Sequence, residues 1–412
     1  MPQRFWNRQT FVLIGIYLII ILRVLSGFGV FKYPGDQFLG DFSHILTYED
    51  FFVTGGDYLA WHPPAAAFNA EYAPVFPGLI LFFLPFMWIG GTASKVLLII
   101  SDIIFPFFTT YLVAKATQLP FSWRLWKPSR VTFITLFIFA MIIFSRPYMS
   151  SLIPGQFTSL IFFLLLYSLI YSKGWALACA TVLKFSLSIW YFPWFVLHKK
   201  HKEVVKALLL FVMIMLFPVI YFPNLLTLYY DYILKMTEHF TSSTIDTFAG
   251  CKAGCWMLVE SGWFLNNKLN ILFKAALLIS LFYVYWKNRG REQPELHALI
   301  FIGAVTLLLF YHRIYDEMLV TVPLLMILII HLKERDWVHA AFPTLIYLYY
   351  LLPSRAWHYL IAHVGPWMEK IGANPSLVHF FPLDSLAVMI LAVFALKRIW
   401  CGQDRSWSVP QA

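Results

Sequence analysis

The chain has few charged residues, few cysteines and none of the common nucleotide-binding or hydrolase motifs. Asp, Glu, Lys and Arg make up 13% of its 412 residues, whereas 60% of the residues are hydrophobic. Soluble domains carry about 25% charged residues. This shortage of charge excludes an ordinary soluble enzyme, and the apolar runs of membrane length indicate a polytopic membrane protein. The absence of P-loop, G-x-S-x-G, H-E-x-x-H and dinucleotide-binding patterns counts against nucleotide-driven transport and hydrolysis.

Cysteine is also scarce, with four residues in the chain. Cys251 and Cys255 lie in "GCKAGC", which offers too few ligands for zinc. They form a small disulfide if their loop faces an oxidising compartment, and otherwise remain thiols. We expect no metal and no cofactor. The formal charge of +10 fits Lys and Arg in cytoplasmic loops better than a nucleic-acid partner, because no soluble basic domain is present.

The apolar runs are long and continuous rather than alternating, so they predict helices and not a β-barrel. They lie at 10–30, 75–91, 95–115, 131–149, 155–172, 175–197, 204–222, 268–286, 296–311, 317–332, 338–353 and 383–400. We therefore predict an all-α membrane bundle of about 10–13 helices, forming a single integral membrane domain over 1–412. The first extracytoplasmic loop (31–73) carries interfacial helices, and a second large one spans 223–267.

Basic residues predict the orientation. Arg4 and Arg8 precede the first apolar run, which we expect to be retained with its N-terminus inside. If every segment crosses, basic stretches 198–203, 287–294 and 333–337 lie inside, but 115–130 lies outside. That conflict disappears if 75–91 dips in and returns and 175–197 is a hairpin or a broken helix. We favour the second scheme; both schemes place the two large loops outside.

The first outer loop gathers acidic side chains. Asp36 and Asp41 lie five residues apart, and Asp41 opens the amphipathic stretch "DFSHILTYEDFF". Asp41 is suited to capping a helix N-terminus; the alternative is that it acts as a general base toward a hydroxyl at the membrane surface. Glu71 and Tyr72 in "AEYAPVFPGLI" either anchor the chain at the interface or form a cleft wall.

Three later features carry polar chemistry. Gln156 in "PGQFTSL" could bond a sugar hydroxyl or cap a helix. Lys184 interrupts the apolar run "TVLKFSLSIW", where a charge is expensive and indicates function unless the side chain snorkels. A cation there would suit a lipid phosphate. In "YHRIYDEM", His312 and Arg313 could bind a phosphate leaving group while Asp316 orients one of them. The alternative for that turn is a hydrated loop with internal ion pairs.

The order of these motifs resembles the GT-C membrane glycosyltransferases. It is most similar to the polyprenyl-phosphate-mannose-dependent branch that includes the mycobacterial phosphatidylinositol-mannoside mannosyltransferases. The resemblance rests on "GDFSHI", "GGDYL", "EYAPVFPGL", "PGQFTSLIFFLL" and "ALACATVLKFSLSIWYFPW", in that order, and less on "HRIYDEMLVTVPLL".

The resemblance implies that Asp41 is the general base of a sugar transfer on the extracytoplasmic side of the plasma membrane. The donor would be a polyprenyl-phosphate-linked hexose, mannose above all, and the acceptor a lipid or glycan. Residues expected to bind the substrates are Asp36, His44, Glu71, Tyr72, Gln156, Lys184, His312, Arg313 and Asp316. The alternatives are a lipid-linked-glycan flippase, which predicts inverted repeats that we do not find, and an O-antigen polymerase or ligase.

Overall fold

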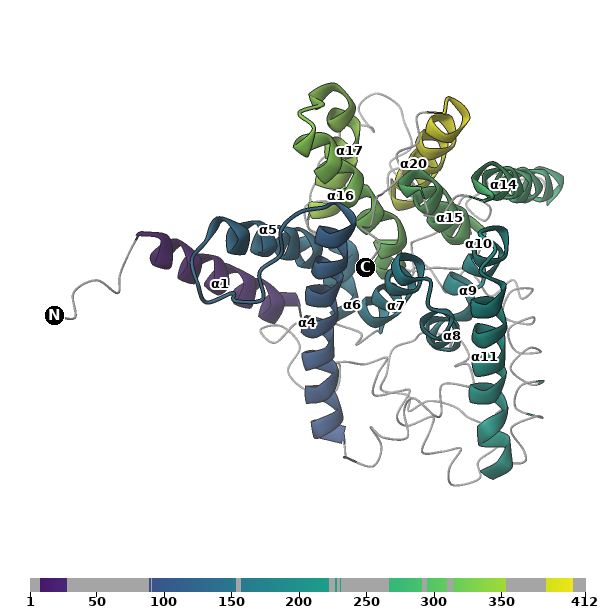
Figure 1. Cartoon of the computed structure of the whole chain (residues 1–412), viewed down its shortest axis with the longest axis horizontal. Helices are drawn as coiled ribbons and strands as arrows, with labels where there is room; N and C mark the ends of the chain where they lie inside the picture. The colour runs from purple at the N-terminus through teal and green to yellow at the C-terminus, as the bar shows by residue number, and fades with distance from the viewer. Residues whose placement is uncertain are drawn as a thin grey trace, which may run out of the picture.

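The structure is a computed structural model that describes residues 8–27, 89, 91–152, 157–221, 227, 230, 267–290, 295–309, 314–352 and 383–402. Its elements are helices (Figure 1). In chain order they are α1 Arg8–Gly27, α4 Gly91–Ala116, α5 Arg130–Phe144, α6 Arg146–Leu152, α7 Thr158–Tyr171, α8 Gly174–Leu183, α9 Phe185–Ser188, α10 Tyr191–Leu197, α11 His201–Tyr221, α14 Asn267–Asn288, α15 Leu296–Leu309, the 3₁₀ helix η3 Ile314–Glu317, α16 Met318–Lys333, α17 Trp337–Leu351 and α20 Leu383–Trp400.

The predicted all-α fold is confirmed for the described residues, and most apolar runs become one helix each. The run 131–149 does not. It divides into α5 and α6, whose axes differ in direction by 66°. Pro147 explains the break, because it has no N–H to donate to the carbonyl of Ile143 and its ring would clash there. Ser145 between the two helices is extended (φ −62°, ψ 140°).

Among the described helices, residues Ala93–Ala116 of α4 are by themselves long and apolar enough to cross a membrane. The bent pair of α5 and α6 passes the same test if it counts as one span, and a membrane-spanning length is not reached by the described apolar helices of 10–17 residues, which include α7, α8, α15 and α16. In Figure 1, α4 and α11 run in opposite directions. The C-terminal end of α4 and the N-terminal end of α11 thus point the same way.

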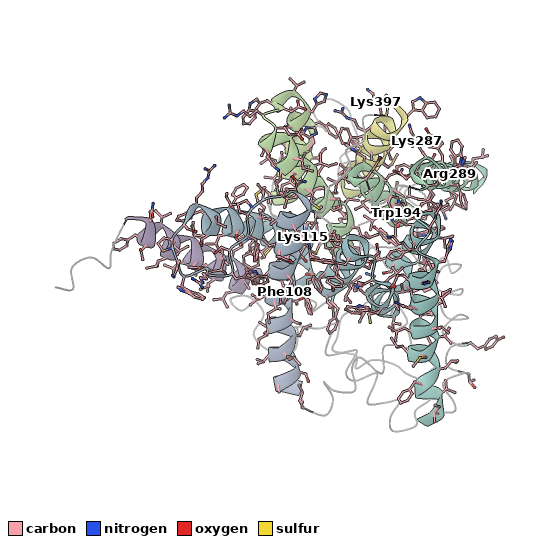
Figure 2. The ribbon with its side chains drawn as sticks, in the orientation of Figure 1. Phe108, Lys115, Trp194, Lys287, Arg289 and Lys397 are labelled. Atoms are coloured by element: carbon pink, nitrogen blue, oxygen red, sulfur yellow. The ribbon has the colours of Figure 1, made fainter. Side chains whose placement is uncertain are left out.

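The C-terminal end of α4 is tied to α7 by one basic side chain. Lys115 on α4, labelled in Figure 2, donates from Nζ to the hydroxyl of Tyr171 at 3.1 Å. The same ammonium lies 4.4 Å from the centre of the Tyr171 ring, which is cation–π distance. The rings of Tyr111 and Trp123 pack beside them, 5.3 Å apart. This end of the bundle therefore combines positive charge with aromatic side chains.

The core lies around α15 and α16, which are apolar on all sides. Leu296 to Leu308 of α15 are all buried. Gly303 allows the two helices to approach closely, because a Cβ atom at this position would lie 2.9 Å from the carbonyl oxygen of Leu319. Helices that are hydrophobic all round are typical of the interior of a large bundle.

The run 175–197 forms a broken helical hairpin. Gly174 N–H at its start donates to Glu203 Oε2 at 2.9 Å, and Leu197 at its end lies four residues before His201. Both ends of the hairpin therefore lie at the beginning of α11, as predicted for a segment that returns to its own side. The approach at Gly174 needs glycine, since a Cβ atom there would be 2.0 Å from the Glu203 carbonyl oxygen. The companion segment 75–91 lies almost wholly outside the described residues.

Candidate active site

Lys184 stands at the break of this hairpin. It ends α8 and precedes α9 with an extended backbone (φ −154°, ψ 91°). Its Nζ lies 2.5 Å from Oδ1 and 2.6 Å from Oδ2 of Asp316, a residue 132 positions later in the chain. The Lys184 side chain is 24% exposed and that of Asp316 is fully buried. The carboxylate thus anchors the ammonium from the protein side, while part of the lysine faces outward.

Asp316 is buried because of its place in η3. This short 3₁₀ helix joins α15 to α16 and packs against α6. Asp316 and the following Glu317 have no exposed surface. The reading of this turn as a hydrated loop is therefore wrong at these two positions. The sequence predicts that Asp316 orients His312 or Arg313, and these two residues lie outside the described part of the chain. The structure pairs Asp316 with Lys184.

The two partners depend on each other electrostatically. Moving a carboxylate out of water costs several kcal/mol unless a counter-charge and hydrogen bonds compensate for it. Here both carboxylate oxygens accept from one ammonium. The pair therefore joins the break of the hairpin to the turn between two core helices, and removing either residue would leave the other charge without this partner.

A further buried carboxylate was missed by the sequence analysis. Asp102 lies in the middle of α4 with 1% of its surface exposed. Its Oδ1 accepts from Ser159 Oγ in the first turn of α7 at 2.7 Å, and its backbone oxygen accepts from the Tyr148 hydroxyl of α6 at 2.6 Å. Oδ2 has no hydrogen-bond partner among the described residues. A charge inside an apolar run was the signal that identified Lys184, and it would have identified Asp102 as well.

Arg146 is a further buried charge near these elements. It opens α6 with 5% of its surface exposed, and its guanidinium carbon lies 4.5 Å from the centre of the Tyr349 ring of α17. Stacking on an aromatic face is a favourable environment for a partly dehydrated guanidinium. Arg146 and Tyr148 thus connect α6 to α17 and α4, and α6 also packs against η3.

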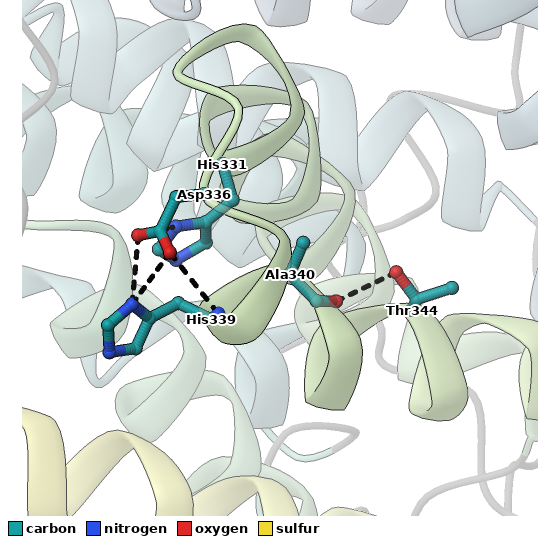
Figure 3. Close-up of polar contacts among 5 residues, drawn as sticks. All are labelled: His331, Asp336, His339, Ala340 and Thr344. Carbon is teal, nitrogen blue, oxygen red and sulfur yellow. Dashed lines mark hydrogen bonds and ion pairs between the residues drawn. The ribbon is translucent and has the colours of Figure 1, made fainter.

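No group of three His, Cys, Asp or Glu side chains that could hold a metal ion occurs among the described residues. At the start of α17, Asp336 lies between two histidines (Figure 3). His339 Nδ1 lies 2.8 Å from Oδ1 and His331 Nδ1 lies 3.2 Å from Oδ2 of the carboxylate. Asp336 also caps α17 by accepting from the backbone N–H of His339, at 3.3 Å. This cluster is a helix cap; the His339 hydrogen bond lowers the pKa of Asp336.

Comparison with protein families gives a match to the model of glycosyltransferase family 87 over residues 76–311, more than half of the chain. The chain belongs to glycosyltransferase family 87. It is thus a membrane glycosyltransferase, which transfers a sugar from a donor to an acceptor. Neither the curated proteins nor the solved structures compared with the chain include a match.

The family 87 match includes Lys184 and Asp102, whereas Asp41 precedes it and Asp316 follows it. A glycosyltransferase needs a base for the acceptor hydroxyl and a group that stabilises the charge on the leaving group. Of the residues selected from the sequence, the structure brings together Lys184 and Asp316. The remaining candidates lie outside the described residues; they are Asp36, Asp41, His44, Glu71, Tyr72, Gln156, His312 and Arg313. Cys251 and Cys255 also lie outside them.

Proposed function

We propose that this family 87 protein transfers a hexose, mannose above all, from a polyprenyl-phosphate sugar to a lipid or glycan acceptor. The reaction takes place at the extracytoplasmic side of the plasma membrane. The observation that supports this proposal is the ion pair between Lys184 and the fully buried Asp316. A lysine that is fixed by a buried carboxylate, and whose side chain is still 24% exposed, is suited to meeting the phosphate of a lipid-linked donor.

The break of the hairpin carries Lys184 away from the cytoplasmic side. The ten residues of α8 span about 15 Å at 1.5 Å per residue, which is about half of a bilayer's hydrocarbon core. Basic residues flank the hairpin at Lys173 and Lys199, and cytoplasmic loops are rich in such residues. The ends of the hairpin then lie at the inner side and its break points outward. In this orientation Asp316, in η3 after α15, would contact the break from the outer side.

In the proposed reaction, Asp41 accepts the proton of the acceptor hydroxyl. The acceptor oxygen forms a bond to the anomeric carbon of the donor sugar, while the bond between that carbon and the phosphate oxygen breaks. The electron pair leaves with the polyprenyl phosphate, so negative charge grows on the phosphate as the reaction proceeds. Attack opposite the leaving group inverts the anomeric configuration. His312, Arg313 and Lys184 stabilise the leaving phosphate.

Asp316 acts through Lys184 in this scheme. An isolated lysine has four rotatable bonds in its side chain and loses rotamer freedom when it is held in one position. The two contacts with Asp316 hold the ammonium in place before the donor binds. The Asp316 carboxylate also reduces the net charge of the site, so the donor phosphate meets an ammonium group whose N–H bonds are already oriented.

The test is a transfer assay in membranes with radiolabelled polyprenyl-phosphate mannose. We expect Asp41→Asn to lose transfer, and Lys184→Met to lower kcat by about 100-fold or more, a typical loss when a group that stabilises transition-state charge is removed. Lys184→Arg retains a cation and should recover part of the rate. Lys95→Gln on α4 is a matched control, since it removes a lysine that has no assigned role.

Two results would contradict the proposal. If Asp41→Asn transfers as well as the unaltered protein while Asp36→Asn is inactive, the base is assigned to the wrong residue. If no lipid-phosphate sugar supports transfer, the donor class is wrong. Equal rates for Lys184→Met and Lys95→Gln would remove Lys184 from the reaction and leave its pair with Asp316 a purely structural contact.

A further inference from the structure

The C-terminal ends of three helices meet at one place in the bundle. Gly290 N–H, just after α14, donates to the carbonyl oxygen of Leu197, the last residue of α10, at 3.2 Å. Lys287 near the end of α14 donates from Nζ to the carbonyl oxygen of Trp400, the last residue of α20, at 3.0 Å. It also donates to the carbonyl oxygen of Ile399. These bonds hold the ends of α10, α14 and α20 together.

Basic side chains gather at this junction. Figure 2 shows Lys287 and Arg289 at the end of α14 and Lys397 at the neighbouring end of α20. Arg289 and Lys397 are exposed, as is Lys199 after α10. Within the described residues 197–200, 286–290 and 397–402 there is no Asp or Glu. These three segments therefore carry positive charge and no carboxylate, and Glu203, four residues after Lys199, is paired with Lys206.

Large aromatic side chains accompany these charges. Trp286 is 56% exposed and Trp400 is 70% exposed. The guanidinium of Arg289 lies 4.9 Å from the centre of the Trp286 ring, and the Tyr283 ring lies 5.5 Å from that of Trp400. Trp beside Lys and Arg at the ends of apolar helices is the arrangement that proteins place at the level of lipid headgroups. We call Lys199, Trp286, Arg289, Lys397 and Trp400 the basic-aromatic junction.

We propose that the basic-aromatic junction binds the headgroup of an anionic phospholipid. Arg289 and Lys397 contact the phosphate, and the rings of Trp286 and Trp400 lie against the glycerol and the upper acyl chain. Charge complementarity selects this occupant, because a zwitterionic headgroup brings its own cation toward the exposed bases. The junction lies at the C-terminal end of the hairpin, whereas Lys184 lies at its break, so this lipid is not the sugar donor.

The experiment measures how phospholipid stabilises the full-length protein in mild detergent. Phosphatidylglycerol is titrated in, and the shift in thermal unfolding temperature is compared with that from phosphatidylcholine. We expect a saturable shift with phosphatidylglycerol and none with phosphatidylcholine or inorganic phosphate. In the double variant Arg289→Gln/Lys397→Gln the apparent affinity for phosphatidylglycerol should fall by about 10- to 30-fold, since each base near an anionic surface contributes roughly a factor of five.

The matched control is Arg124→Gln/Lys127→Gln, which also removes two exposed bases next to exposed tryptophans, in the loop after α4. It should bind phosphatidylglycerol as the unaltered protein does. An equal loss in both double variants would overturn the proposal in favour of non-specific surface charge, and an equal shift from inorganic phosphate would overturn a lipid site. Comparable unfolding temperatures of the variants in phosphatidylcholine show that both are folded. The unaltered protein giving the same shift with phosphatidylcholine would refute the headgroup selectivity.

Discussion

The ion pair between Lys184 and Asp316 predicts an unequal response to removing its two partners. Lys184→Met leaves a carboxylate with no exposed surface and without its counter-charge, so we expect a loss of about 3–5 kcal/mol in the free energy of unfolding. Asp316→Asn leaves a lysine whose side chain is 24% exposed and can be hydrated. The loss there should be smaller, about 1–3 kcal/mol.

The double variant Lys184→Met/Asp316→Asn separates the pair from its surroundings. Neither residue is charged in it, so its cost should fall short of the sum of the two single costs by about 2 kcal/mol. The measurement is chemical unfolding of the purified protein in detergent micelles, followed by circular dichroism. Costs that add to within about 0.5 kcal/mol, or a larger loss for Asp316→Asn than for Lys184→Met, would refute the reasoning.

Activity adds an independent readout to this cycle. If Lys184 stabilises the leaving phosphate, the double variant recovers stability relative to Lys184→Met but recovers no transfer. A purely structural pair would instead show activity that rises with the recovered stability. The same three proteins therefore test both the energetics of the pair and its role in the reaction.

Three further changes test other parts of the fold. Gly174→Ala should destabilise the protein by about 1–3 kcal/mol in the same unfolding assay, because its Cβ atom would lie 2.0 Å from a backbone oxygen. The Cβ atom of Gly15→Ala in α1 meets nothing within 4 Å, so this variant should stabilise the protein by up to about 1 kcal/mol. Asp102→Leu should lower the unfolding temperature more than Asp102→Asn, which retains an oxygen that can accept from α7; equal effects would show that this hydrogen bond is unimportant. The hydrogen bond from His339 lowers the pKa of Asp336, so the contribution of this carboxylate to stability is present above the ordinary carboxyl pKa of about 4 and is lost as the pH falls through the lowered pKa. Asp336→Asn should therefore flatten the acid side of the plot of stability against pH. An unchanged acid slope in Asp336→Asn would contradict this prediction.

Hydrophobic pattern predicted the helices well but did not predict where they bend. The runs 296–311 and 383–400 correspond to α15 and α20 because an apolar run of this length has few alternatives to a helix. The bend between α5 and α6 was missed, although Pro147 carries its cause. The interruption at Lys184 was expected because the need for a returning segment came from the basic residues on both sides of it.

Lys184 and Asp316 were each selected from the sequence, Lys184 as a charge in an apolar run and Asp316 as part of a polar turn. That they contact each other could not be predicted, since 132 positions separate them and no local periodicity relates the two. The same holds for Asp102, whose partners come from α6 and α7.

The amino-acid sequence by itself determined that this protein is apolar and helical, because composition and local pattern decide which segments leave water and become helices. That it is a glycosyltransferase follows from its match to family 87. Only the tertiary structure decided which buried charges meet. An ion pair requires atoms from distant segments within about 3 Å of each other, and that distance depends on how the hairpin of α8 to α10 packs against η3 and α11. Local pattern contains no information about this packing.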